Sequence, residues 1–227
     1  MSDLTFDWEA LSGMERRRRA QLVNSLSGVK PANLIGTEGP DGTPNCAIIS
    51  SVVHLGSDPA LLGHVMRPPV ERERGSHSYH NLKETGQYTL NHVSTGWFKQ
   101  AHQTSARYPD GTSEFEAVGL TPLFRCGFEA PAVAESPVRM GLELQEELAL
   151  PNGCKFIVGA LRWVEFAEEL WTEDGAVDLA RAEVAAITGL DGYHGLRPMA
   201  RLSYAKPDQP LAESPDFQRA PTPPKRP

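Results

Sequence analysis

Cysteine and long apolar runs are both scarce in this chain. It has three cysteines among 227 residues, Cys46, Cys126 and Cys154, and their spacing matches no metal-ligand pattern. An odd number of such cysteines is typical of reduced thiols in a cytoplasm. No apolar run has the length needed to span a bilayer, and the N-terminal residues lack the apolar core of a signal peptide. We therefore expect a cytoplasmic protein that makes no membrane contact.

Positive charge is also in deficit, and several signature motifs are absent. The formal net charge is −7, which argues against a nucleic-acid-binding surface. There is no GxGxxG fingerprint that opens a helix, no GxxxxGK[ST] loop and no GxSxG elbow, so Rossmann, P-loop and serine hydrolase sites are not expected. His77 and His80 lie three residues apart, but no carboxylate or cysteine stands at a metal-ligand offset from them. No metal site is expected.

The chain does contain a series of short apolar segments separated by turn residues. Segments around 32–38 and 43–53 flank a turn rich in glycine and proline, which indicates a β-hairpin. An Asn-Gly pair at 152–153 indicates another hairpin. Further strands are expected at 60–66, 88–93, 137–149 and 154–166, and short helices at 8–26, 76–85 and 96–106. Many hairpin-linked strands with few helices predict a mainly β fold, an antiparallel barrel rather than a doubly wound sheet.

A pair of hydroxyls interrupts the apolar pattern of segment 43–53. Ser50 and Ser51 are poor central-strand residues, so they either contact a polar ligand or mark a strand end that turns toward solvent. Cys46, earlier in the same segment, could lie beside a ligand, but a small buried core residue is the better interpretation. The sequence leaves both readings of the serine pair open.

Positive charge is concentrated just before the second predicted helix. The cations of segment 67–81 are Arg67, Arg72, Arg74 and His77. Free amides at a helix N-terminus favour an anion, and arginine adds charge-assisted hydrogen bonds. The segment therefore predicts either a phosphate-binding corner or a loop whose arginines pair with Glu71 and Glu73.

Taken together, these motifs resemble the flavin reductase-like family with the FMN-binding split barrel. The matching elements are Asn45-Cys46-Ala47, Ser50-Ser51, Asp58-Pro59, Ser78 and Asn81, Glu84-Thr85-Gly86, Asn91, Ser113-Glu114-Phe115, Gly119-Leu120 and Ala130-Pro131. The resemblance covers roughly residues 30–205. It implies a six-stranded antiparallel Greek-key split barrel with a few short helices, and a homodimer with one FMN per protomer near the subunit interface.

The resemblance also implies which residues hold the cofactor. Three would border the isoalloxazine ring: Asn45, Cys46 and Ala47. Three would supply backbone and hydroxyl contacts to its polar edge: Ser50, Ser51 and Val52. His77, Ser78 and Asn81 match the phosphate and ribityl segment, with Arg67 or Arg74 as the cation. An FMN phosphate is a dianion that needs a basic corner, while the ring needs apolar walls and a few aimed donors.

The expected activity is that of an FMN-dependent oxidoreductase of the flavin reductase type. NADH or NADPH would be the transient hydride donor, and a small molecule or free flavin the acceptor. Asn152-Gly153-Cys154 stands where members that reduce free flavin for a partner often carry Gly-Asp-His. An alternative is therefore an FMN-binding electron carrier or flavin store without nicotinamide turnover. A split barrel like that of pyridoxamine phosphate oxidase matches the serine set less well.

Three parts of the chain are expected to differ in organisation. Residues 1–29 would form an N-terminal helix packed on the barrel, with the arginine run at 16–19 either holding a phosphate or forming a solvated face. Residues 30–205 would form the flavin reductase-like domain. Residues 206–227 are rich in proline and poor in apolar residues, which predicts an extended or disordered tail.

Overall fold

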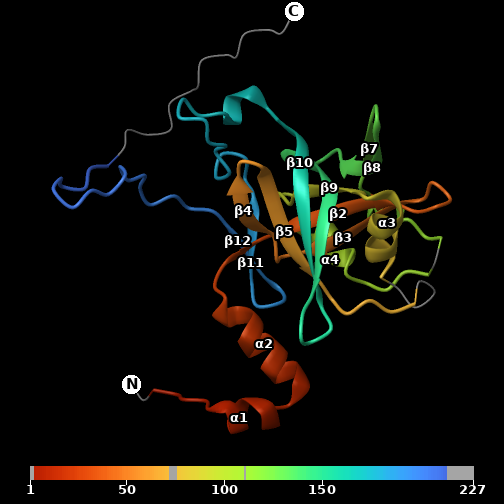
Figure 1. Cartoon of the computed structure of the whole chain (residues 1–227), viewed down its shortest axis with the longest axis horizontal. Coiled ribbons are helices and arrows are strands. Elements are labelled where there is room, and N and C mark those ends of the chain that lie inside the picture. The colour runs from red at the N-terminus through yellow and green to blue at the C-terminus, as the bar shows by residue number, and fades with distance from the viewer. Residues whose placement is uncertain (1–2, 72–75, 110, 214–227) are drawn as a thin grey trace, which may run out of the picture.

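A seven-stranded antiparallel sheet dominates the computed structural model, which describes residues 3–71, 76–109 and 111–213 (Figure 1). The strands run in the order β3-β2-β6-β9-β10-β5-β4, and every neighbouring pair is antiparallel. Their bounds are β2 Asn33–Glu38, β3 Pro44–Ile49, β4 Val53–Ser57, β5 Ala60–Met66, β6 Gln87–His92, β9 Val138–Ala149 and β10 Lys155–Phe166. The predicted mainly β, antiparallel class is confirmed.

Smaller elements surround this sheet. β1 (Lys30–Pro31), β11 (Ala185–Thr188) and β12 (Gly192–Gly195) form a three-stranded sheet, and β7 (Pro122–Arg125) pairs with β8 (Phe128–Val133). The helices are α1 Trp8–Gly13, α2 Arg16–Leu26, α3 His77–Thr85, α4 Phe98–Gln103 and α5 Glu114–Val118, with a 3-10 turn at Glu168–Leu170. No helix within the described ranges is long and apolar enough to cross a membrane.

The main sheet has seven strands rather than the six expected, because the predicted strand 43–53 divides in two. Residues 50–52 separate β3 from β4. The Ser51 hydroxyl donates to the Val65 carbonyl and accepts from the Val65 N–H, both at 3.0 Å. It thereby satisfies the backbone of β5 beyond the last β4–β5 pair, Val53 with Gly63. β3 and β4 are the two edge strands of the sheet. The Ser51 contact therefore connects the segment that follows β3, at one edge, to β5, which lies next to the other edge.

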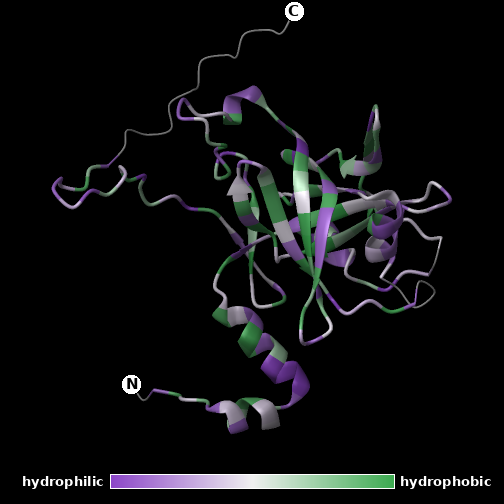
Figure 2. Cartoon of the chain, in the orientation of Figure 1, coloured by the Kyte–Doolittle hydropathy of each residue, from purple (hydrophilic) through white to green (hydrophobic). Residues whose placement is uncertain are grey.

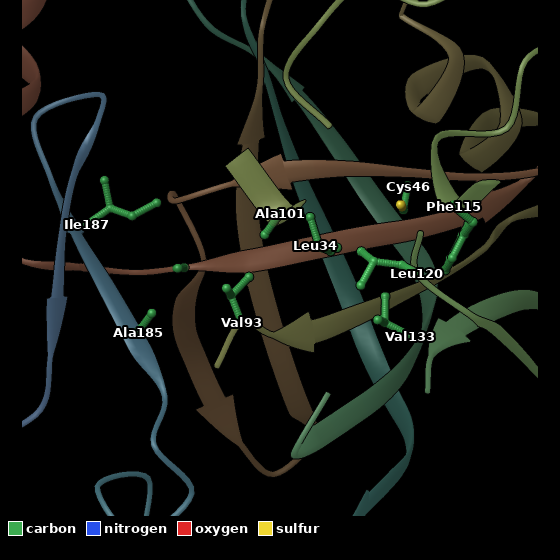
Figure 3. Close-up of a cluster of buried hydrophobic side chains, with 10 residues drawn as sticks. Leu34, Cys46, Val93, Ala101, Phe115, Leu120, Val133, Ala185 and Ile187 are labelled. Carbon is green, nitrogen blue, oxygen red and sulfur yellow. The ribbon is translucent and has the colours of Figure 1, made fainter. Parts of the chain in front are cut away.

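Apolar side chains fill both faces of β2 and β3, as the alternation along a strand requires. Leu34 and Cys46 belong to a cluster with Phe115, Val133 and residues of β11 (Figure 3). Ile35 instead faces a second cluster inside the sheet, with members of β6, β9 and β10, and Ala47 packs against it. These hairpin strands are thus held from both sides.

The N-terminal helices form an arm that leaves the barrel (Figure 1). The single helix predicted over 8–26 is instead two helices, α1 and α2, with the break at residues 14–15. Glu15 starts α2 by accepting from the N–H groups of Arg17 and Arg18. Neither helix contains a buried residue, and the arginine run colours much of α2 hydrophilic in Figure 2. The arm is anchored at its far end, where Lys30 Nζ donates to the carbonyls of Asn24 and Gly189.

Candidate functional site

A hollow of about 270 Å³ lies where the β2–β3 turn meets the start of α3. Its walls come from that turn, from β3, from α3 and from the segment ahead of α5. The lining residues are Gly39, Pro40, Asp41, Thr43, Asn45, His77, Asn81, Gly111 and Thr112. The fold therefore brings three sequence-predicted site residues, Asn45, His77 and Asn81, to one place from two elements far apart in the chain.

The first turn of α3 begins with an unusual backbone conformation. Ser76 has φ +61° and ψ +27°, a left-handed conformation directly ahead of right-handed helical residues. Successive backbone N–H groups in such a left-then-right arrangement converge on a concave, partly positive spot. The N–H groups of Tyr79 and His80 bond the Ser76 carbonyl. Among the described residues no side chain caps this end, which is the positive end of the helix dipole.

The loop ahead of α3 is fixed to the helix by its own backbone. The Ser76 hydroxyl accepts from the Val70 N–H at 3.0 Å, and the His80 Nε2 lies 2.8 Å from the Val70 carbonyl. His80 is thus engaged with the backbone, while His77 lines the hollow. Within the described ranges no three His, Cys, Asp or Glu residues gather as metal ligands would. The start of α3 consequently presents the positive end of a helix, with the His77 side chain at the wall of the hollow.

Buried polar side chains connect this helix to the hairpin. Asn45, 6% exposed, lies 3.0 Å from the Thr37 hydroxyl and 2.8 Å from the Ser78 hydroxyl, measured from its side-chain amide. Asn81 Nδ2 donates to the same Thr37 oxygen at 3.2 Å. Thr37 and Asn45 are direct partners across the β2–β3 pair. The network therefore locks α3 onto the strands that carry the hollow.

A buried carboxylate completes the network from a third element. Glu114 is 6% exposed at the start of α5, and the Ser113 hydroxyl holds this segment to β3 by donating to the Pro44 carbonyl at 2.6 Å. With its amide turned over, Asn45 donates from Nδ2 to Glu114 Oε2 at 3.0 Å. Burial raises the pKa of Glu114 from 4.5 to about 7, against the lowering effect of backbone N–H groups. Thr37 and Glu114 are the site residues that the sequence interpretation missed.

The remaining predicted residues occupy different surroundings. Cys46 belongs to the apolar cluster with Leu34 and Phe115 (Figure 3) and does not line the hollow, and burial raises the pKa of its thiol. Ala47 and Val52 pack against the cluster inside the barrel and stay partly exposed. Ser50 lies partly exposed in the β3–β4 connection, and the Ser51 hydroxyl is engaged with Val65.

The predicted cations are placed only in part. Arg67 follows β5 directly and is exposed. Its neighbour Pro68 lies against Gly153, so the arginine sits beside the turn that joins β9 and β10. Arg74, the other predicted cation, lies outside the described residues.

These features define a class of protein: a mainly β, antiparallel split barrel with a hollow lined largely by polar residues. The chain belongs to the flavin reductase like domain family, whose model matches residues 28–179. That span includes β2–β10, α3 and α5, so every element that builds the hollow lies inside the family domain. The family and the split-barrel fold predicted from the sequence are confirmed.

Solved structures share this fold over most of the chain. A protein of Shewanella frigidimarina, assigned by name as a flavin reductase with a split barrel domain, is 44% identical, with a TM-score of 0.84 over 89% of this chain and 100% of that one. Component B of a nitrilotriacetate monooxygenase from Bacillus cereus is 18% identical, with a TM-score of 0.77 over 88% and 98%. Flavoredoxin of Desulfovibrio vulgaris is 20% identical, with a TM-score of 0.65 over 80% and 92%.

Proposed function

We propose that the protein is an FMN-binding oxidoreductase of the flavin reductase type, with NADH or NADPH as hydride donor. The observation that carries this proposal is the meeting of a helix start preceded by a left-handed residue with Asn45, His77 and Asn81 in one hollow of a flavin reductase-family chain. When bound, FMN would accept a hydride and pass electrons to oxygen, free flavin or another small acceptor.

The start of α3 fits the phosphate end of FMN. A phosphate is a dianion with several acceptor oxygens, and the N-terminus of a helix offers backbone N–H donors and the positive end of a dipole. His77 adds a ring nitrogen at the wall of the hollow. Ser78 lies on the same turn behind that wall, 7% exposed, with its hydroxyl 2.8 Å from the Asn45 amide. The formal net charge of the chain is −7, so a site that favours an anion differs in charge preference from the average surface of this protein. FMN, with its terminal phosphate, suits this corner.

The connection between β3 and β4 fits the ring end. Ala47 and Val52 are partly exposed and rest on the barrel interior, so they offer an apolar wall that needs no rearrangement. Ser50 provides a polar edge beside that wall. The protein's part in the reaction is to orient the ring and to keep donors near its polar atoms; the redox chemistry belongs to the cofactor.

We also propose a homodimer, with the cofactor near the subunit interface. β4 is an edge strand of the main sheet, and its Val53 and Leu55 are 45% and 42% exposed. An edge strand with exposed apolar side chains is favourable for covering by another chain. β4 follows the connection that would carry the ring, which brings the proposed interface close to the cofactor.

Spectroscopy of the purified protein tests the proposed activity. We expect a yellow protein, or a colourless one that takes up added FMN, whose flavin absorbance bleaches when NADH or NADPH is added without oxygen. FAD titrated in parallel tests the choice of flavin, since the helix start should favour a terminal phosphate. Protein that neither contains nor takes up FMN would refute the proposal.

A second candidate is an FMN-binding electron carrier or flavin store without nicotinamide turnover. The observation in its favour is the turn after β9, where Asn152-Gly153-Cys154 offers neither an acid nor a histidine to a nicotinamide. The likeness to a flavoredoxin concerns the fold alone. Bound FMN that dithionite reduces, while both nicotinamides leave it oxidised, would select this candidate.

A further inference from the structure

The proposed function leaves one buried charged group without a role. Glu114 is 6% exposed, and its segment is attached to β3 by the hydrogen bond from Ser113 to the Pro44 carbonyl. Two residues earlier, Thr112 lines the hollow. The carboxyl group therefore lies directly behind the wall of the site, and it reaches that wall through the amide of Asn45.

The nitrogen and oxygen of the Asn45 amide can be exchanged in place, and the two orientations suit different protonation states of Glu114. In one, Nδ2 donates to the hydroxyl oxygens of Thr37, at 3.0 Å, and Ser78, at 2.8 Å, but Oδ1 then faces only acceptors unless the Glu114 carboxyl carries a proton. In the other, Nδ2 donates to Glu114 Oε2 at 3.0 Å, and Oδ1 accepts from both hydroxyls and from the Cys46 N–H. An ionised carboxylate only accepts hydrogen bonds, whereas a neutral carboxyl can donate. The protonation state of Glu114 therefore selects the orientation.

We propose that Glu114 is a positioning residue that controls, through the Asn45 amide, whether the Ser78 hydroxyl is available to donate to a ligand at the start of α3. When Glu114 is ionised, the Ser78 hydroxyl donates its proton to Asn45 Oδ1 and cannot donate to a ligand. When Glu114 is neutral, its O–H donates to Oδ1, Nδ2 satisfies Ser78, and the Ser78 proton is released. This inference rests on the proposed function for the identity of the ligand, FMN.

Charge and hydrogen bonding act in the same direction. A neutral Glu114 also removes a negative charge from behind the proposed phosphate site. The neutral form therefore favours FMN binding both through the released Ser78 proton and through the weaker charge repulsion. Because burial raises the pKa of Glu114 to about 7, both forms are populated near neutral pH. FMN affinity should accordingly fall as the pH rises through 7.

Other titratable groups around Glu114 have defined surroundings. On β3 the neighbour is the Cys46 thiol, whose pKa is raised by burial and further by Glu114 and Glu135. The helix α4, which packs on α5, carries Lys99 and His102, and both are exposed. Glu116, on α5 itself, is exposed as well, which makes it a matched control.

The experiment compares FMN dissociation constants of the full-length protein, Glu114→Gln and Glu116→Gln between pH 5.5 and 8.5, by quenching of flavin fluorescence. Glutamine donates to Oδ1 as the neutral acid does, so Glu114→Gln should hold the FMN-favouring orientation at every pH. We expect the ratio of the original constant to that of Glu114→Gln to rise by up to about tenfold from pH 6 to pH 8. The titration of the FMN phosphate is common to all proteins and cancels in the ratio. Glu116→Gln should follow the original protein.

A second measurement separates this inference from the proposed function. In the protein without FMN, the Asn45 side-chain amide resonances should move with pH near 7, and Glu114→Gln should abolish that movement. A constant ratio of dissociation constants, or an Asn45 amide that ignores pH, would overturn the positioning role even if FMN binds. If FMN does not bind at all while the amide still titrates, the proposed function fails and the Glu114–Asn45 coupling stands.

Discussion

His64 shows what a single buried titratable group does to stability. Its side chain is fully buried on β5, and within the described part of the chain neither ring nitrogen has a hydrogen-bond partner. The ring packs against Tyr88 at a centroid distance of 5.2 Å, and the Tyr88 hydroxyl is also without a partner there. Burial lowers the pKa of His64 from 6.5 to about 4, because a charged imidazolium would have no compensating group.

The free energy of unfolding should therefore decrease in acid. Between pH 6.5 and pH 4 the unfolded chain takes up a proton on His64 that the folded protein does not, so stability is present above pH 6.5 and is lost as the pH falls toward 4. The full loss corresponds to about 3 kcal/mol. His64→Leu should reduce this loss, measured as urea unfolding at pH 7 and pH 5. The exposed His54 offers a control, and equal pH dependence in His64→Leu and His54→Leu would contradict the argument.

Single residues also mark the limit of the sequence interpretation of the site. The family resemblance predicted Asn45, His77 and Asn81 as site residues, and the three do lie together. The residue types around position 76 predicted a helix start there. Thr37 has the pattern of an ordinary β-forming residue. Glu114 belongs to the Ser113-Glu114-Phe115 match, but the sequence assigns it no role at the site. Their roles come from contacts between elements distant in the chain, which local pattern does not encode.

The β9–β10 hairpin shows how two elements depend on a close approach. Gly141 on β9 faces Trp163 on β10, and a Cβ added to Gly141 would collide with the indole ring. The ring cannot move freely, because the Arg125 guanidinium lies 5.0 Å from its centroid on one side and Phe128 makes an edge contact at 5.6 Å. The glycine is therefore required by packing across the strand pair.

Gly141→Ala should destabilise the protein by about 1–3 kcal/mol, since the methyl group overpacks a held aromatic ring. Chemical denaturation gives the value. Gly56→Ala, also in a strand but with its nearest added contact at 3.5 Å, should change stability by less than about 0.5 kcal/mol. Equal effects of the two substitutions would show that the Trp163 contact is not responsible.

Elements with a strong local sequence pattern were predicted correctly, whereas short strands were not predicted. The Asn-Gly turn after β9 forms as expected: the Leu150 N–H bonds the Cys154 carbonyl at 2.9 Å, and Gly153 has φ +83°. The four-residue strands β7, β11 and β12 are too short to show a two-residue period, and each depends on a partner for its identity. A strand end at Ser50 and Ser51 was one of the two interpretations left open, although the predicted strand 43–53 ran through it. The sequence could not show that the Ser51 side chain bonds the backbone of Val65.

For the chain as a whole, the N-terminal arm is separable from the barrel. Neither α1 nor α2 contains a buried residue, and the arm projects away from the sheet in Figure 1. Outside Lys30, its side-chain link to the barrel is Gln21 with Asp191, at 3.3 Å. Large apolar residues on the arm, among them Trp8 at 80% and Leu26 at 72% exposure, thus add no core in this chain.

Removal of residues 1–27 should leave the barrel folded. We expect a midpoint of thermal unfolding within a few degrees of the full chain and an unchanged FMN dissociation constant, because the hollow draws on residues 39–112. Circular dichroism and flavin fluorescence provide the measurements. An unfolded product, or loss of FMN binding, would mean that the arm completes the domain.

The direction of the arm has a practical consequence. In Figure 1, α1 stands apart from α3 and the β2–β3 turn, the elements that line the hollow, and the small β11–β12 sheet lies at the junction. A fusion partner or a surface linker joined at the amino end would be tethered clear of the mouth of the pocket. Immobilised or fused in that way, the barrel should keep its entrance open to incoming substrates.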